Sequence, residues 1–156
     1  WTLSNLLNRA PKCVIPLIGP EFIQQTVSFG EETPFTIKKE IVYFLALLIT
    51  NCSREMLESC LINEPIILLI SDILDSSEPN LILMCISAFQ KIMTTAGNVN
   101  SKTCNTALVL QYFDSCDIPA QLEDIIEQND KQNSLLYSAA LKLQSNIRLA
   151  MHLLSR

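Results

Sequence analysis

Apolar residues fill long stretches of this chain, and prolines and short polar clusters separate them. The stretch IVYFLALLIT (41–50) has an apolar side chain on almost every side of a helix, which is typical of a helix buried between neighbours. Pro begins helices well at their first position and ends the preceding one, so it marks helix boundaries. The pattern predicts helices throughout; those of the clearest unit span 54–63, 65–75 and 80–95.

The prolines also indicate an internal repeat. Pro20 and Pro65 are 45 residues apart, and so are Pro34 and Pro79. A further copy begins at Pro119, displaced by the polar stretch GNVNSKTCN (97–105), which we interpret as a loop. A period near 45 residues lies in the range of HEAT and armadillo repeats, in which each unit stacks on its neighbours.

The repeat divides the chain into one fragment and three units of three helices. We expect a single domain, with a fold of about three armadillo repeats and a partial N-terminal one, wound as a right-handed α-α superhelix (a solenoid). The predicted units are 1–9 (the last helix of a repeat), 11–52, 54–97 and 105–156. The predicted helices outside the central unit are 11–19, 20–29, 36–51, 106–116, 119–128 and 134–154.

Composition agrees with an all-α fold. The chain is 49% hydrophobic and 17% charged, with a mean hydropathy of +0.28. It contains only 3 Gly, and turn clusters at the spacing of a β-sandwich are absent from the sequence. We therefore expect most helices to be covered on more than one side.

The charge limits the classes of partner. The formal net charge is -5, whereas a protein that binds a nucleic-acid backbone is normally basic. An acidic surface suits a basic partner, and simple solubility explains it equally well. The longest uncharged apolar run is about half the ~20 residues that a membrane-spanning helix needs, so we expect neither nucleic acid nor membrane as a partner.

Cysteine and histidine usage argues against a metal site and against catalysis. The chain has 6 Cys without a C-x-x-C pair and 1 His, His152, so we expect no zinc and no other cofactor. The free thiols indicate a reducing compartment. Nucleophile and phosphate-loop motifs are absent, and the adjacent Glu31 and Glu32 beside a Pro resemble a loop or helix start. We therefore expect a non-enzymatic protein.

Three stretches carry a resemblance to a known family. WTLSNL (1–6) resembles the Trp-x-x-x-Asn stretch on the third helix of the armadillo repeats of importin-α, the adaptor of nuclear import. TIKKEIVYFLALLITN (36–51) is similar to the next third helix of that family. YFDSCDIPAQLEDIIEQNDKQNSLLYSAALKL (112–143) resembles its final repeat. The resemblance covers nearly the whole chain, and the order and spacing of these motifs carry it.

The resemblance implies a groove for the basic nuclear localisation signal of a cargo protein, in its secondary, or minor, half. Trp1 and Asn5 match one Trp/Asn pair, whose indole holds lysine stems and whose amide pairs with the peptide backbone. Ser4 matches a wall position beside them. Glu40 matches the acidic position that receives a basic side chain.

Other positions depart from the family's pattern. Tyr43 stands where the next Trp is usual, and Leu47 stands where its partner Asn belongs. In the third unit, Ile86 and Gln90 hold the equivalent places, and Gln90 retains an amide. The resemblance therefore implies a half-present site and weak binding of a signal peptide by this stretch alone.

The family's last repeats also contact the export receptor, an importin-β-class protein that works with a GTP-bound Ran-type GTPase. The resemblance assigns this contact to Glu123, Asp124 and Glu127. It further implies partnership with importin-β-class import and export receptors and shuttling between cytoplasm and nucleus.

Several alternatives remain open at the level of sequence. Trp1 is alternatively a core aromatic and Asn5 a surface polar residue. Tyr43 is alternatively a buried ring with its hydroxyl at the groove edge, and the acidic residues near 123–127 a solvated face. A protein–protein interaction scaffold of armadillo or HEAT type, unrelated to nuclear transport, is the alternative function, because fold does not fix function.

Overall fold

The computed structural model describes residues 1–97, 106–129 and 134–155, and every regular element in these ranges is helical. This confirms the expectation of an all-α fold. The elements are α1 (Thr2–Arg9), α2 (Pro11–Val14) with a 3-10 turn (Ile15–Leu17), α3 (Pro20–Glu32), α4 (Phe35–Asn51), α5 (Arg54–Met56) with a π-helical turn (Leu57–Leu61), α6 (Glu64–Ser71), α7 (Pro79–Ala96), α8 (Thr106–Ser115), α9 (Ile118–Gln128) and α10 (Leu135–Leu154).

Prolines and polar caps begin these helices. Pro20, Pro65 and Pro79 stand in the first two positions of α3, α6 and α7, where a missing N–H costs little because it has no intrahelical partner. The side-chain oxygen of Asn63 accepts a hydrogen bond of 3.1 Å from the main-chain N–H of Ile66 and caps α6. The repeated Pro pattern in the sequence thus corresponds to repeated helix starts.

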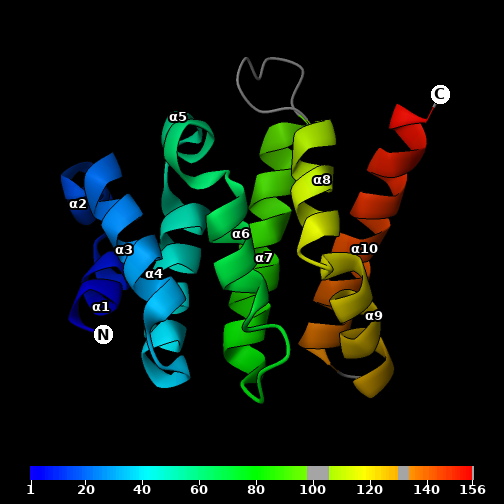
Figure 1. Ribbon diagram of the computed structural model, residues 1–156, viewed down its shortest axis with the longest axis horizontal. Coiled ribbons are helices and arrows are strands. Elements are labelled where there is room, and N and C mark those ends of the chain that lie inside the picture. Colours follow the sequence, from blue (N-terminus) through cyan, green and yellow to red (C-terminus); the bar gives the residue numbers. More distant parts are fainter. Residues whose placement is uncertain (98–105, 130–133, 156) are drawn as a thin grey trace.

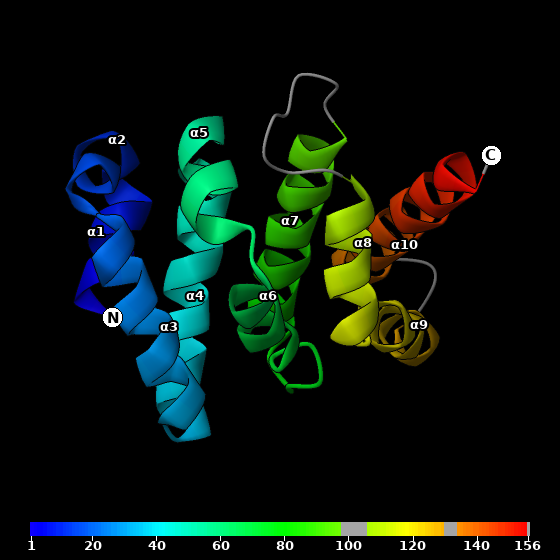
Figure 2. The same ribbon diagram turned by 45° about the horizontal axis from the view of Figure 1, so that its top comes forward.

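The long helices lie side by side in a row. α1 contacts α4, α4 contacts α7 and α7 contacts α10. The shorter helices pack against this row, α3 and α6 on α4, α8 on α7 and α9 on α10. Figures 1 and 2 show the chain advancing in order along the longest axis, from the N-terminal to the C-terminal end. The arrangement is compatible with an α-solenoid.

α4 contains the longest continuous buried run of the N-terminal half. From Ile41 to Ile49 only Tyr43 is partly exposed, which confirms that this apolar run packs on several sides. Aromatic contacts join the row to the shorter helices. The rings of Phe89 on α7 and Phe113 on α8 meet edge to face with centroids 5.2 Å apart.

Two predicted helices are broken. The predicted helix 11–19 is an α-turn and a 3-10 turn, because Pro16 lacks the N–H that a continuing helix requires. The predicted helix 54–63 changes to a π-helical turn, in which the N–H of Ile62 bonds to the carbonyl of Leu57 at 3.1 Å.

The predicted helix 65–75 is shortened. α6 ends at Ser71, and the N–H of Leu74 bonds to the carbonyl of Ser71 at 2.9 Å, a tighter i→i+3 turn. Of the predicted loop 97–105 only Gly97 belongs to the described residues, so residues 98–105 and the predicted unit boundary at 105 lie outside them.

Within the described ranges, no helix combines the length and the apolar character that crossing a bilayer requires. Cys13, Cys52, Cys60, Cys85 and Cys116 are free thiols, and Cys104 lies outside the described residues. Burial raises the pKa of the Cys52 thiol to about 11 and that of the Cys85 thiol to about 12.

The contact between α7 and α8 predicts a large loss of stability for Phe89→Ala. Phe89 is fully buried, and truncating a buried Phe costs about 3–5 kcal/mol through lost transfer energy and a cavity. Phe29→Ala is the matched control, because Phe29 is 59% exposed, and we expect it to cost less than about 1 kcal/mol. Urea unfolding followed by circular dichroism measures both, and equal losses would contradict the packing described here.

The thiol environments predict site-selective alkylation of the folded chain. At pH 8 a thiol with a pKa near 12 is ionised in about one molecule in ten thousand, so Cys85 should resist iodoacetamide until the chain unfolds. Cys13 is exposed and should react first. Mass-spectrometric mapping of a Cys104→Ser protein gives the rate at each site. Rapid native labelling of Cys85 would argue against the buried position of α7.

Candidate functional site

Five of the six residues that the sequence assigns to a peptide groove line a single hollow. Its volume is about 550 Å³, and Trp1, Ser4, Asn5, Glu40 and Tyr43 all line it. We call it the Trp1 hollow; its complete lining is Trp1, Ser4, Asn5, Thr36, Lys39, Glu40, Tyr43, Glu78, Asn80, Leu81 and Met84. The lining comes from the row of long helices and includes no residue of α3 or α6.

Helical spacing explains why these side chains face the same space. Ser4 and Asn5 lie three and four positions after Trp1, so they share one face at the start of α1. On α4, Glu40 and Tyr43 lie four and seven positions after Thr36, which is again one face. Because α1 packs beside α4 and α4 beside α7, the faces form adjoining walls.

The walls offer an aromatic surface and an available amide. Trp1 is 81% exposed, so its indole belongs to the surface of the hollow in this structure. Ser4 is buried at 2% exposure and closes the wall. Asn5 is half-buried, and its side-chain amide makes no hydrogen bond to another described residue. Tyr43 is partly buried and packs against the core, and it also lines the hollow.

The charged side chains leave the hollow negative by one unit. Lys39 forms an ion pair with Glu78, and its ammonium also lies 5.8 Å from the centroid of the Phe35 ring. Glu40 is half-exposed, with its carboxylate 3.5 Å from the main-chain nitrogen of Trp1. Two carboxylates therefore face one ammonium among the lining side chains, and that ammonium is already paired.

The second half of the predicted groove differs from the sequence-based assignment. Gln90 does not line the hollow; its amide donates a hydrogen bond of 3.2 Å to the carbonyl of Ala139 on α10. Ile86 is fully buried and Leu47 is 5% exposed, so both serve the core. These positions fall on the faces of their helices that pack against neighbours, which the sequence does not distinguish from the open face.

Six lining residues are not among the predicted site residues: two lie on α4, Thr36 and Lys39, and four lie near the start of α7. Glu78, Asn80, Leu81 and Met84 come from the start of α7 and the turn before it. The sequence of α7 contains a signal for Asn80 and Met84, since these two residues and Ser87 are spaced four and three positions apart and share one face of the helix.

The three acidic residues assigned to a receptor contact do not form one cluster. Glu123 faces α10, where it accepts hydrogen bonds from Arg148 at 2.9 Å and from Gln144 at 3.3 Å. Asp124 lies instead on the side of α9 that faces the turn after α6, and Glu127 is exposed. Glu123 is thus largely engaged within the chain.

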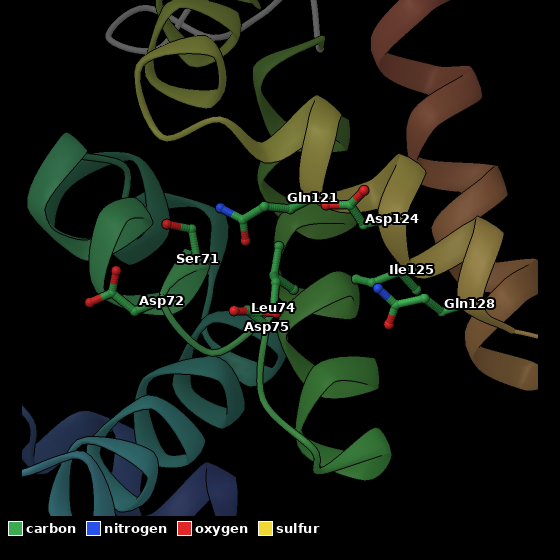
Figure 3. A pocket seen from close by; sticks show the side chains of 8 residues that line it. All are labelled: Ser71, Asp72, Leu74, Asp75, Gln121, Asp124, Ile125 and Gln128. Atoms are coloured by element: carbon green, nitrogen blue, oxygen red, sulfur yellow. The ribbon is translucent and has the colours of Figure 1, made fainter.

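Asp124 lines a second pocket of about 420 Å³, shown in Figure 3 between α9 and the turn that follows α6. Asp72 in this pocket pairs with Lys38 of α4 at 2.7 Å, and Gln121 donates to the carbonyl of Cys116 at 3.1 Å. Among the residues that the structure describes, no group of three or more His, Cys, Asp or Glu side chains is arranged to hold a metal ion.

Comparisons of the chain with protein-family models, with curated protein sequences and with solved structures found no match. The residues and their geometry are therefore the basis for inferring a function.

Proposed function

We propose that this chain is the C-terminal part of a nuclear import adaptor of the importin-α type, built from armadillo repeats, that binds a basic, extended peptide in the Trp1 hollow. The observation that carries the proposal is the meeting of Trp1, Asn5, Glu40 and Tyr43 in one hollow. The predicted repeats 11–52, 54–97 and 105–156 and their right-handed stacking belong to the same proposal, supported by the row of long helices.

The side chains that line the Trp1 hollow suggest how a basic peptide would be recognised. The indole of Trp1 and the ring of Tyr43 would hold the aliphatic stem of a Lys or Arg, with a cation–π attraction of about 0.5–2 kcal/mol. Glu40 would receive the charged head. The unbonded amide of Asn5 offers a donor and an acceptor to the peptide backbone, which fixes direction and register.

The proposed interaction is non-catalytic and weak in this chain. Only one Trp/Asn pair is available, because Leu47 and Ile86 are buried and Gln90 is bonded to α10. Affinity of this hollow alone therefore depends on one basic side chain and a few backbone hydrogen bonds. Tight binding of a complete signal would need further sites on the adaptor.

The remaining partners follow from the same proposal. Contact with an export receptor of the importin-β class would involve the exposed acids Asp124 and Glu127 rather than Glu123, which pairs with Arg148. The adaptor would work in the cytoplasm and the nucleus, with import and export receptors as partners. No cofactor is part of this mechanism.

An α-solenoid scaffold unrelated to transport is the second candidate. The burial of Leu47 and Ile86 favours it, because these positions interrupt the regular ladder of peptide-clamping residues that an import adaptor needs.

The chain's single Trp makes the proposal directly testable. A lysine- and arginine-rich extended peptide should shift the emission of Trp1, whereas a peptide with acidic residues in place of the basic ones should not. Asn5→Ala, which removes one hydrogen-bonding group, and Glu40→Gln, which removes the charge of one ion pair, should each weaken binding about fivefold, or about 1 kcal/mol. Raising the salt concentration should weaken it further.

The matched control for Glu40→Gln is Glu21→Gln, an exposed acid at the start of α3, which should leave the titration unchanged. The scaffold would be favoured if the emission of Trp1 did not change when the basic peptide is added. It would also be favoured if the Glu40→Gln and Glu21→Gln proteins bound the peptide equally well.

A further inference from the structure

We propose that the ligand of the Trp1 hollow carries a carboxylate about three residues from its basic residue, and that Lys91 on α7 binds that carboxylate. This inference rests on the proposed function of the hollow and adds the substrate class: a peptide that changes sign along its length, rather than a uniformly basic one.

Lys91 lies on the same face of α7 as the hollow. Asn80, Met84, Ser87 and Lys91 are spaced four, three and four positions apart, so they form one stripe along the helix. Asn80 and Met84 line the hollow, Ser87 is exposed and Lys91 is partly exposed. The stripe therefore continues the open surface from the hollow toward the C-terminal end of α7.

The neighbours of this stripe place Lys91 on its α4 side. Gln90, one position earlier, turns toward α10 and bonds to Ala139. Burial dominates the pKa of Cys52, at the end of α4, but the positive charge of Lys91 acts on the same thiol in the opposite direction. Lys91 therefore lies on the side of α7 that faces α4, the same side on which Met84 lines the hollow.

The charge of this surface reverses along α7. The hollow presents Glu40 and Glu78 against the paired Lys39. α7 itself contains no Asp or Glu, and Lys91 is its only charged residue. Lys91 forms no ion pair with another described residue, so its ammonium is available to a ligand.

The neighbouring helix α10 also carries positively charged side chains. It too lacks Asp and Glu, and it carries Lys142 and Arg148. Arg148 pairs with Glu123, whereas Lys142 is exposed and has no ion pair with a described residue. A uniformly basic peptide that continues past the hollow would therefore meet like charge.

Helix geometry sets the spacing within the ligand. Met84 and Lys91 are seven positions apart, which is about 10 Å along a helix that rises ~1.5 Å per residue. An extended peptide rises about 3.3 Å per residue. About three residues therefore separate a basic side chain that enters the hollow beside Met84 from a carboxylate over Lys91.

Four peptides of equal length, each with one central Lys-Arg pair, test the inference through the emission of Trp1. They carry Glu three residues after the pair, Glu three residues before it, Gln at both places, or Lys at both places. One of the two Glu peptides should bind about three- to fivefold more tightly than the Gln peptide, the range expected for a partly exposed ion pair. The Lys peptide should bind less tightly than the Gln peptide.

Two variants assign the effect to Lys91. Lys91→Glu should reverse the order, so that the Lys peptide binds more tightly than the Glu peptide, and a gain of this kind requires a folded protein. Lys91→Gln should remove the advantage of the Glu peptide over the Gln peptide. Lys12→Glu, at an exposed lysine of α2, is the control with the same charge change and should keep the original order.

The outcomes separate this inference from the function on which it rests. If basic peptides bind but do not discriminate, or if the order survives in Lys91→Glu, the carboxylate preference is overturned and the Trp1 hollow keeps its proposed function. If none of the four peptides changes the emission of Trp1, both are overturned.

Discussion

The packing of α4 between α1 and α7 is the constraint on which the rest of the structure depends. Nearly every residue from Ile41 to Ile49 is buried, and at about 25 cal/mol per Å² of apolar surface such a helix is stable only when neighbours cover it. That requirement fixes the distance and register between adjacent long helices. The faces of α1, α4 and α7 that this packing does not bury then have to lie next to one another.

The Trp1 hollow forms where these unburied faces of α1, α4 and α7 meet. At the start of α4 the polar positions Thr36, Lys39 and Glu40 lie beside the first residues of α1 and α7. The ion pairs of Lys38 with Asp72 and of Lys39 with Glu78 connect α4 to the turn between α6 and α7. They also neutralise Lys38 and Lys39, whereas Glu40 has no lysine or arginine partner among the described residues.

Burial decides how far such a groove extends. Leu47 would continue the line of Tyr43 one turn later, but it is covered, and Gln90 is used to hold α7 against α10. The aromatic, amide and acidic side chains of the hollow therefore lie at one end of the open face of α7, and Lys91 lies farther along that face. Under the proposed function, this change of sign along α7 favours a ligand with a charge gradient over a repetitive basic tract.

The sequence by itself determined the class of fold, the positions of the helices and the shared face of Trp1, Ser4 and Asn5, because proline placement and helical spacing are local properties. Local patterns also located most helix ends, but not the breaks at Pro16 and Leu57, where main-chain hydrogen bonds changed type. Only the tertiary structure decided that Glu78 and Met84 join the hollow and that Gln90 leaves it. Which face of a helix stays open depends on how its neighbours are rotated and packed against it, and no single helix encodes that.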